Sequence, residues 1–388
     1  MSQNYTAAIV GCGDIAHHHV KGYQRAGVEL VAVVDPLEIA RAQYREEYGI
    51  ERDFASVEEM LAEVAPDIVS VCTWHLLHPA PTIAAARAGV KGVICEKPMA
   101  VGLGLADEMV AVCEEHGTRL VISHQRRFTP GWEKARELVQ SGAIGQVQQV
   151  ETKVGAGLLN CGTHVIDGAR FMLGDPETEW VMGAVERQSE RFERDTPIED
   201  GSMALVHMAG GVQFLLQTDL DMSEAWHFFV RGSGGLIDAT ETRCRLFNEA
   251  SGGWQEQDLG VPAEQIDVIG GKANERQTRE LIAWIEGGPE HRGSGRRARE
   301  TVAVMMALLE SARQHRVVRF PLQEQGYPLE LMLQEGKLEP AQKGRYDIRG
   351  YLNREGVDEG EYAKLRATGM GHHQIMRTLS EREEERNG

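Results

Sequence analysis

Short, continuously apolar segments recur through the first 123 residues and alternate with longer segments of helical pattern. Each is four or five residues long, which is typical of buried strands rather than helices. They lie at Thr6–Val10, Leu30–Val34, Ile68–Cys72, Gly92–Cys95 and Leu120–Ser123. Apolar strands separated by helices pair in parallel and are covered on both faces. The pattern therefore predicts a doubly wound α/β domain over residues 1–123.

The segments between these strands carry helix start and stop signals. Asp14–Ala26 is followed by Gly27, a residue that ends helices in the left-handed conformation. Ser56 and Glu59 match a capping box and predict a short helix that ends near Val64. Two further helices, each followed by a glycine, are expected at about Pro79–Ala88 and Leu103–His116.

After Ser123 the pattern changes to pairs of short strands around glycine-containing turns. A first strand is expected at Gln146–Lys153, and two helices, at about Arg276–Glu286 and Ala298–His315, are expected to close the region. Successive hairpins indicate an antiparallel sheet, so residues 124–322 are predicted to form an α+β domain. The paired strands lie at Met203–Met208 with Val212–Asp219, His227–Arg231 with Leu236–Ala239, and Arg243–Asn248 with Trp254–Asp258.

Residues 323–388 form a third region, rich in Glu, Arg and Gly and poor in apolar residues. Such a composition is typical of an arm that packs on a partner subunit or of a partly disordered extension. Glu361–Glu381 has a helical pattern, and Leu365–Leu379 weakly resembles a helix-turn-helix.

Composition narrows the class of protein. The formal charge of −18 argues against nucleic-acid binding, which needs clustered Lys and Arg. No apolar run approaches the length of a membrane span, and no export signal precedes the first strand. The six cysteines lie far apart without a CxxC pair, which favours reduced thiols and a cytoplasmic location.

A glycine turn follows the first strand and opens the first helix, which is the context of a Rossmann dinucleotide fingerprint. Gly11 permits the tight turn, Gly13 lets the backbone approach a pyrophosphate, and Ala16 allows close packing of helix on strand. Asp35 ends the second strand, where a carboxylate accepts hydrogen bonds from the adenosine ribose and repels a 2′-phosphate. NAD is therefore favoured over NADP. The alternative is a structural turn with Asp35 as a helix cap.

Lys97 lies in the sequence Glu96-Lys97-Pro98, just beyond the carboxyl end of a predicted strand. Ligands bind at this edge of open parallel sheets. A lysine that is partly desolvated there has a lowered pKa, as a general acid or base requires.

A second group of candidate residues spans Asn160 to Asp167. If a helix begins at Gly162, His164 and Asp167 lie one turn apart on one face. Asp167 could then orient His164 for proton transfer. A core histidine beside a capping Asp is an equally good reading of this segment.

Together these motifs resemble the Gfo/Idh/MocA oxidoreductase family, the family of glucose-fructose oxidoreductase and inositol dehydrogenase. The similarity rests on three motifs and on the sequence His124-Gln-Arg-Arg-Phe128, and it covers residues 5 to about 322. The three motifs are Gly11-Cys12-Gly13-Asp14-Ile15-Ala16, Glu96-Lys97-Pro98 and Gly162-Thr-His164-Val-Ile-Asp167.

The resemblance implies that Lys97 and His164 act on a sugar hydroxyl as acid and base. It also implies that Asp167 binds substrate or orients His164, and that the sheet domains pair into a homodimer or homotetramer. Besides the glycine turn and Asp35, it places six residues around the cofactor: Thr73, Trp74, His78, Glu96, Lys97 and Gln125.

One position departs from the family pattern. Inositol-dehydrogenase-like members carry Asp four residues before the histidine, where this chain has Asn160. A neutral amide does not raise the basicity of a neighbour as a carboxylate does, although it can hydrogen-bond a substrate hydroxyl. Asn160 is thus a candidate for substrate binding, and inositol is not favoured as the substrate.

Other conspicuous residues carry weaker signals. Consecutive helical residues point about 100° apart, so the rings of His17-His18-His19 cannot converge on one metal ion, and no metal is expected. Arg126 and Arg127 are expected to serve substrate or cofactor, with Arg127 a substrate-binding candidate. Trp226 and Trp254 could stack on sugar, but tryptophans in antiparallel strands are more often core residues.

These observations favour an NAD-dependent dehydrogenase or reductase that acts on a sugar, sugar derivative or cyclitol. Two alternatives remain. The same site could perform NAD-recycling elimination or glycoside cleavage through transient oxidation of a sugar. The chain could also be a non-catalytic NAD-binding regulator.

Overall fold

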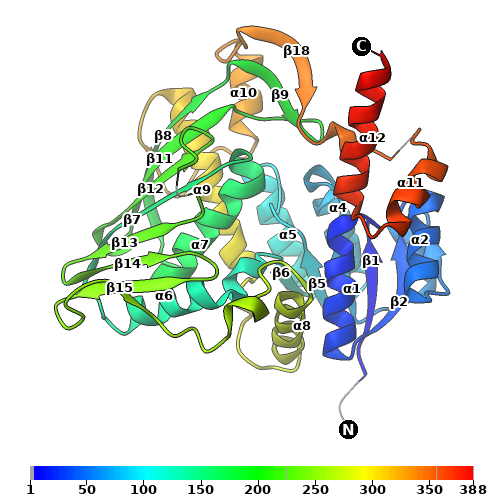
Figure 1. Cartoon of the computed structure of the whole chain (residues 1–388), viewed down its shortest axis with the longest axis horizontal. Coiled ribbons are helices and arrows are strands. Elements are labelled where there is room, and N and C mark those ends of the chain that lie inside the picture. Colours follow the sequence, from blue (N-terminus) through cyan, green and yellow to red (C-terminus); the bar gives the residue numbers. More distant parts are fainter. Residues whose placement is uncertain (1–3, 224, 355, 388) are drawn as a thin grey trace.

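The chain folds into two domains, each built on a sheet, and a C-terminal segment that contacts both (Figure 1). This computed structural model describes residues 4–223, 225–354 and 356–387. The sheet of the first domain has six parallel strands in the order β3-β2-β1-β4-β5-β6, which confirms the predicted doubly wound domain. Its strands are β1 Thr6–Val10, β2 Glu29–Val34, β3 Asp53–Phe54, β4 Ile68–Val71, β5 Gly92–Cys95 and β6 Arg119–Ile122.

Alternate residues of these strands pack into two different cores, because helices cover both faces of the sheet. In β1, Ala7 and Ile9 belong to one core, and Ala8 and Val10 belong to the other. The helices between the strands are α1 Asp14–Ala26, α2 Glu38–Tyr48, α3 Val57–Glu63, α4 Pro79–Arg87 and α5 Leu103–Glu115. Their signals act as predicted: Gly27 ends α1 with a φ of 78°, and the N–H of Glu59 donates to Ser56 Oγ at 3.3 Å.

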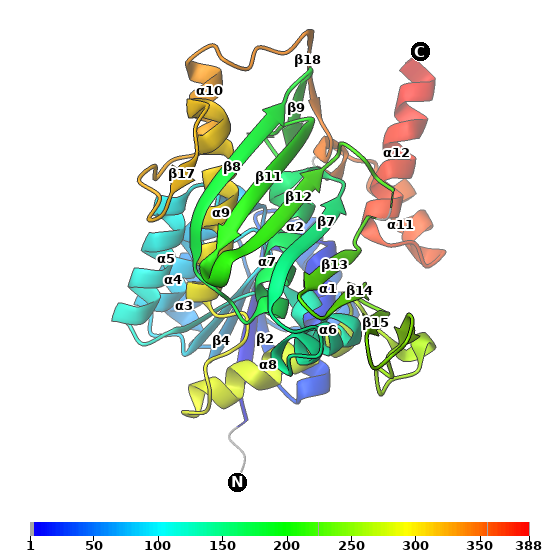
Figure 2. The ribbon, with the colours of Figure 1, turned by 90° about the vertical axis from the view of Figure 1, so that its left-hand side faces the viewer.

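The second domain contains a nine-stranded sheet in the order β16-β15-β14-β13-β7-β12-β11-β8-β17. Its neighbours are antiparallel except for β7 and β12, so the expected antiparallel sheet is confirmed in the main. Figure 2 shows helices on one face only, with the other face turned to the viewer. The strands are β7 Val147–Val154, β8 Thr178–Glu186, β11 Gly201–Met208, β12 Val212–Thr218, β13 Phe228–Gly232, β14 Gly235–Ala239, β15 Cys244–Asn248, β16 Gln255–Glu256 and β17 Val318–Arg319.

Three helices lie against the covered face: α6 Pro130–Gln140, α7 Thr163–Leu173 and α9 Gly295–Gln314. A further helix, α8 (Gly271–Ile285), was expected to close this domain but packs on α1 of the first domain. At the crossing, a Cβ on Gly22 would lie 2.6 Å from Asn274 Cβ, so the two helices approach closely because Gly22 has no side chain. Leu281 of α8 is buried in the first domain's core.

The C-terminal segment is folded and packs on its own chain. Strand β18 (Gln342–Asp347) pairs in parallel with β9 (Ser189–Glu193), which pairs in turn with β10 (Thr196–Pro197). Helix α10 (Pro328–Gln334) packs on α9, and the expected helix over 361–381 is two helices, α11 (Glu359–Ala367) and α12 (His372–Asn387). A small core joins α11, α12 and the turn η6 (Gly350–Leu352), made of Leu352, Tyr362, Leu365, Ile375 and Met376.

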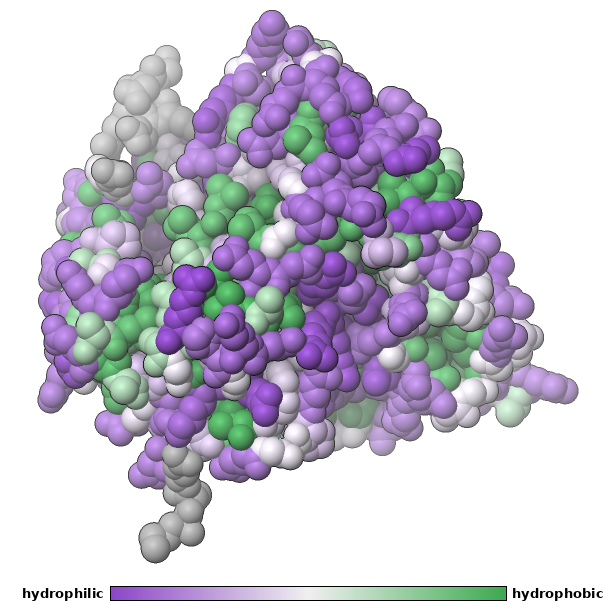
Figure 3. All heavy atoms as spheres, turned by 180° about the vertical axis from the view of Figure 1, so that it is seen from behind, coloured by the Kyte–Doolittle hydropathy of each residue, from purple (hydrophilic) through white to green (hydrophobic). Residues whose placement is uncertain are grey.

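The thiols and the surface are those of a chain without disulfides in its described part. All six cysteines are free thiols, and five of them are buried. Within the described ranges, no helix combines the length and the apolar character that crossing a bilayer requires. On the face turned away in Figure 1, apolar patches are broken up by hydrophilic side chains (Figure 3).

Candidate active site

The glycine turn has the geometry of a phosphate cradle. Gly11 has a φ of 93°, and a Cβ there would lie 2.8 Å from the carbonyl carbon of Cys72, so only glycine fits. A Cβ on Gly13 would meet nothing within 4 Å, so no other part of the described structure crowds the backbone at the start of α1. Unpaired N–H groups at a helix N-terminus attract anions, which makes this turn suitable for a pyrophosphate.

Asp35 lies beside the turn and is held by backbone. Its Oδ2 accepts a hydrogen bond from Cys12 N–H at 2.9 Å, and its Oδ1 accepts one from Leu37 N–H at 2.9 Å. The carboxylate therefore joins the glycine turn to the end of β2 and also supports the start of α2. Each carboxylate oxygen retains a second lone pair that a ribose hydroxyl can use.

The loops after β4 and β6 contribute two unsatisfied polar groups. Thr73 Oγ1 and Gln125 Oε1 are buried and have no hydrogen-bond partner among the described residues. Buried polar atoms are almost always paired in folded proteins, so these atoms suit a bound polar ligand. The residues predicted to hold a dinucleotide thus fit one at this edge of the sheet.

His78 and Glu96 have structural partners in this region. The two ring nitrogens of His78 lie 2.8 Å from Pro98 O and 3.1 Å from Thr73 O, so the ring ties the loop after β4 to the loop after β5. Burial raises the pKa of Glu96, but the hydrogen bond with His19 at 3.0 Å, the charges of His19 and Lys97 and a hydrogen bond with Ser123 together outweigh burial and lower it. His78 and Glu96 are therefore tied to neighbouring parts of the first domain, and their role at the cofactor cleft is to hold its loops in place.

Lys97 is held by a single residue of the other domain. Its Nζ donates to Asn160 Oδ1 at 2.9 Å and to Asn160 O at 3.0 Å. Asn160 lies in the π-helical turn η3 (Gly157–Gly162), which precedes α7. Burial lowers the pKa of Lys97, and the nearby carboxylate of Glu96 offsets only part of this shift. The ammonium group is thus held by neutral oxygens and loses its proton more easily than a surface lysine.

His164 lies next to this lysine, in the first turn of α7, and is only 5% exposed. Burial lowers its pKa well below the ordinary value, and the charges of Lys97 and Arg126 add to the shift. The ring is therefore neutral near pH 7. Its Nδ1 has no hydrogen-bond partner in the described part of the chain. Lys97, Asn160 and His164 are therefore brought together, as the sequence predicted.

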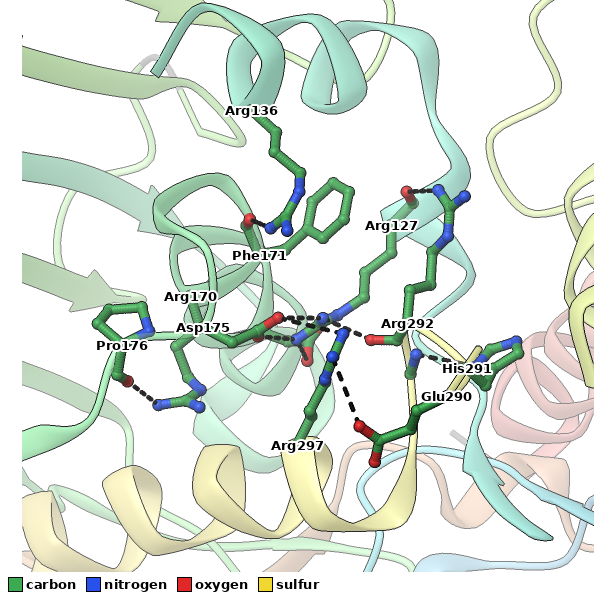
Figure 4. A network of polar contacts seen from close by, with 12 residues as sticks. Arg127, Arg136, Arg170, Phe171, Asp175, Pro176, Glu290, His291, Arg292 and Arg297 are labelled. Atoms are coloured by element: carbon green, nitrogen blue, oxygen red, sulfur yellow. Dashed lines mark hydrogen bonds and ion pairs between the residues drawn. The ribbon is translucent and has the colours of Figure 1, made fainter. Parts of the chain in front are cut away.

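Asp167 and Arg127 are placed differently from expectation. Arg127 is fully buried and donates to both carboxylate oxygens of Asp167 at 2.7 Å. It also donates to Asp175 Oδ1 at 2.8 Å and to Arg292 O at 2.6 Å, within a polar network of the second domain (Figure 4). These contacts occupy the groups that were expected to bind substrate or to orient His164. This pair therefore anchors α7 in the domain.

A different histidine occupies the space next to Asp167. His124 Nδ1 lies 3.4 Å from Asp167 Oδ1, and its Nε2 lies 3.1 Å from Thr163 Oγ1. The ring meets that of His164 edge-on, with the centroids 5.8 Å apart. Asp167 therefore faces Arg127 and His124, and it is His124 that contacts the ring of His164.

Sequence reasoning set aside or missed several residues near the site. Arg126 stacks on Trp226 with its guanidinium carbon 3.9 Å from the ring centroid, and Trp226 also neighbours His164. Glu193, at the end of β9, and Arg194, in the turn that follows, lie close enough to influence the pKa of Lys97. They lie almost a hundred residues from Lys97 along the chain, and no local pattern connects them.

Of the three consecutive histidines of α1, His17 and His19 contact separate partners. His17 Nδ1 lies 2.5 Å from Tyr48 Oη, whereas His19 contacts Ser70 and Glu96. No cluster of three or more His, Cys, Asp or Glu side chains suited to a metal ion occurs in the ranges that the structure describes.

Two sequence profiles of one family match the chain. The profile of the "oxidoreductase family, NAD-binding Rossmann fold", named GFO_IDH_MocA, matches residues 5–124. The profile of the GFO/IDH/MocA C-terminal domain matches residues 151–238. Together the two matches cover more than half of the chain and include Lys97, Asn160 and His164.

Characterised relatives include a reductase and a dehydrogenase of sugars. The 1,5-anhydro-D-fructose reductase of Ensifer adhaerens is 32% identical over 224 residues, which are 53% of this chain and 66% of that protein. The D-apiose dehydrogenase of Paraburkholderia graminis is 25% identical over 345 residues, 81% of this chain and 90% of that protein. Among solved structures, a levoglucosan dehydrogenase in complex with NADH and levoglucosan has the same fold. It superposes with a TM-score of 0.74 at 20% identity, covering 82% of this chain and all of that one.

Proposed function

We propose that this chain, which belongs to the Gfo/Idh/MocA family of oxidoreductases, transfers hydride between NAD and a carbinol carbon of a sugar, a sugar derivative or a cyclitol. The observation that supports this most directly is the environment of Lys97. The lysine lies at the carboxyl edge of an NAD-binding sheet, is bonded only to neutral oxygens of Asn160, and has a lowered pKa. It lies beside a histidine that is neutral at physiological pH.

The dinucleotide would be held by residues of the first domain. The N–H groups of the glycine turn suit the pyrophosphate, and Asp35 suits the adenosine ribose and disfavours a 2′-phosphate. Thr73 and Gln125 offer unpaired buried oxygens toward the same cleft. When bound, the nicotinamide supplies the hydride acceptor or donor of the reaction.

The proton of the reaction is assigned to Lys97. In the oxidative direction the neutral amine accepts the proton of the substrate hydroxyl as hydride leaves the same carbon. In the reductive direction the ammonium returns it. Asn160 keeps Nζ in place through two hydrogen bonds and offers its own amide to a neighbouring hydroxyl. His164 hydrogen-bonds the reacting hydroxyl through its free ring nitrogen and orients it toward Lys97.

The named relatives favour net oxidation or reduction over the two alternative functions. They are called a reductase and a dehydrogenase, and both act on sugars or sugar derivatives. We extend to this chain only the class of substrate, a polyhydroxylated carbon skeleton, and not the individual compound.

The test is a screen of sugars, cyclitols and sugar nucleotides with the full-length protein, followed by NADH absorbance and by product analysis. We expect at least one polyol to reduce NAD. Product formation without net NADH would favour redox-assisted elimination. Tight NAD binding without turnover of any polyol would favour a regulator.

We also propose that the chain forms a homo-oligomer through the open face of the large sheet. Met182 and Met203 are 57% and 48% exposed on this face, and Leu205, two residues after Met203 on β11, lies directly opposite Met182. Exposed apolar side chains on a sheet face are typical of a surface covered by a partner. Sedimentation of the wild type and of Met182→Lys is the test, with a dimer or tetramer expected for the wild type and a smaller species for the variant. A monomeric wild type would contradict the proposal.

A further inference from the structure

The C-terminal segment spans the two domains near the start of α1. On one side, β18 pairs with β9, and Ile348 N–H donates to Phe192 O at 2.9 Å. On the other side, the segment bonds two residues of α2. Arg366 donates to Glu47 at 3.0 Å, and Arg354 donates to Gln43 at 2.9 Å. Figure 1 shows β18 and α12 on the same side of the molecule, with α12 next to the start of α1. This is the end of the first domain at which the dinucleotide would bind.

A single carboxylate in this segment positions two arginines. Asp347 Oδ1 accepts hydrogen bonds from Arg194 N–H at 3.0 Å and from Arg349 N–H at 2.9 Å. Its Oδ2 accepts one from Asp195 N–H at 2.9 Å. Asp347 therefore holds the turn of the β9–β10 hairpin against the C-terminal segment, and the two arginines start from neighbouring backbone positions.

Arg194 occupies a position where arginine is unfavourable. The two residues of the hairpin turn, Arg194 and Asp195, have φ values of 49° and 65°. Positive φ at both positions is typical of a type I′ turn, which favours Asn and Gly. A long side chain held in this region carries strain, and such strain accumulates at functional sites. The turn geometry therefore does not explain an arginine at position 194, which points to a function of its side chain.

Arg194 is incompletely paired, whereas Arg349 donates from Nη1 to Tyr351 Oη at 3.2 Å. Arg194 Nε is buried and has no hydrogen-bond partner among the described residues. Glu193, 1% exposed, is the nearby carboxylate, and its Oε1 lies 3.9 Å from Arg349 Nε without a hydrogen bond. Glu193 therefore does not use the Nε donor of Arg194, which is left for a further hydrogen-bond acceptor such as an anion.

The hairpin that carries Arg194 reaches the loop after β4, beside the cleft between the domains. Burial lowers the pKa of His75 to about 3, and the charge of Arg194 is the next contribution. The same charge acts on Lys97. His75, in the turn η1 (His75–Leu77) after β4, bonds Thr196 Oγ1 at 2.8 Å, so the hairpin packs directly on the loop that follows β4.

His373 connects this cluster to the glycine turn. Burial lowers the pKa of His373. The charge of Asp14, the first residue of α1, opposes this shift, whereas those of Arg349 and Arg194 add to it. A Cβ on Gly371, two residues before His373, would lie 3.8 Å from Asp14 Oδ1, so the C-terminal segment reaches the start of α1, where the pyrophosphate would bind. The hairpin that carries Arg194 packs on the loop after β4, at the same edge of the first sheet.

We propose that Arg194 and Arg349 bind the pyrophosphate of the dinucleotide from the side opposite the glycine turn, so that the C-terminal segment completes the cofactor site. Guanidinium groups match phosphate oxygens in bidentate geometry, and the unpaired donors of this cluster are suited to that role. The inference rests on the proposed function, because it requires a bound dinucleotide. It implies that the cofactor dissociates slowly, since release requires the segment to separate from one of the domains.

The test measures NADH binding to the full-length protein without any polyol, by nicotinamide fluorescence, so that turnover does not enter. We expect Arg194→Gln and Arg349→Gln each to weaken NADH affinity about 10- to 100-fold, mainly through faster dissociation. Lys343→Gln is the matched control, because it removes one positive charge from an exposed position of β18 and should leave affinity unchanged.

Arg194→Gly separates a binding role from a structural one. Glycine relieves the positive φ, so thermal stability should hold or rise while NADH affinity falls as in Arg194→Gln. A structural arginine would give the opposite result, with lower stability and unchanged affinity.

The remaining outcomes are also distinct. If the wild type binds no NADH, the proposed function fails. If the wild type binds NADH and both arginine variants bind it equally well, only the present inference fails. That conclusion would hold even if their KM for an acidic substrate increased, because the arginines would then bind a substrate anion.

Discussion

Two buried sets of polar residues meet at α7, and they differ in how completely their side chains are hydrogen-bonded. Arg127 has carboxylates or carbonyls around its whole guanidinium group, with hydrogen bonds to Asp167, Asp175 and Arg292. Among the described residues, one ring nitrogen of His164, one turn before Asp167, has no hydrogen-bond partner, and the Nζ of Lys97 donates to neutral oxygens of Asn160. At Asp167 the polar groups are therefore fully hydrogen-bonded, whereas at His164 they can still bond a ligand.

The pKa shifts of the two groups differ in the same way. Burial alone would raise the pKa of Asp167, but the charge and hydrogen bonds of Arg127, with contributions from His124 and Arg170, together outweigh burial and lower it. Burial lowers the pKa of Lys97 and of His164, and no partner reverses either shift. A paired buried charge stabilises one protonation state, whereas a desolvated lysine held by neutral groups can change state near physiological pH. The contrast separates anchoring residues from candidates for proton transfer.

The largest expected effect is that of Lys97→Met. Removing the general acid or base should lower turnover about a thousandfold while NADH binding stays within a few-fold of wild type. The measurement combines steady-state turnover with an NADH titration. Lys91→Met, at an exposed lysine just before β5, is the control and should keep full activity. Turnover of Lys97→Met within tenfold of wild type would remove this lysine from the mechanism.

Arg127→Met tests the other group and should affect stability first. It leaves Asp167 buried without its partner, which costs about 3–5 kcal/mol in the free energy of unfolding. Urea denaturation measures this loss, and Arg319→Met on the exposed edge strand β17 is the control. The double variant Arg127→Met/Asp167→Leu should recover part of the stability, because it removes the unpaired charge. A large increase in KM with little loss of stability would instead return Arg127 to substrate binding.

The fold of the first domain was accessible from the sequence because its signals are local. The five apolar segments correspond to β1, β2, β4, β5 and β6 with ends within one residue. Helix α2 gives no such signal, because its sequence EIARAQYREEY buries only Ala40 and Tyr44. The packing of α8 on α1 could not be inferred either, since the two helices are about 250 residues apart and the close approach depends on Gly22 and Asn274.

In the candidate site, too, features with a local sequence signal could be predicted and contacts between distant residues could not. Lys97 and His164 were found because each lies in a short motif at the end of a strand or the start of a helix. The i, i+3 spacing correctly placed Asp167 one turn from His164, but spacing does not tell which side chain a carboxylate faces. Its partner Arg127 lies 40 residues upstream. The C-terminal segment was expected to be an arm or partly disordered, because neither the pairing of β18 with β9 nor the small core around Leu352 has a local hydrophobic signature.

A smaller effect is expected for His164→Gln. Glutamine keeps a hydrogen-bonding group at the site but fits the reacting hydroxyl less well, so turnover should fall about a hundredfold. Stability should change little, because the lost ring nitrogen Nδ1 has no hydrogen-bond partner in the described structure. The kcat and urea midpoint of His164→Gln are compared with those of His116→Gln, an exposed histidine at the end of α5. Equal turnover of the two variants would make His164 a core histidine, the alternative that its sequence context left open.

The smallest and most specific effect is that of Asn160→Asp. In the oxidative direction Lys97 must be neutral, so kcat/KM should fall as pH decreases through its pKa. A carboxylate at position 160 would place a negative charge about 3 Å from Nζ, where Asn160 Oδ1 now lies at 2.9 Å. That charge favours the ammonium and raises the pKa of Lys97. The acidic limb of the pH profile should therefore move upward by about one pH unit, with little change in the maximum. Profiles of wild type and Asn160→Asp test this, and an unmoved or downward-shifted limb would show that the limb reports a group other than Lys97.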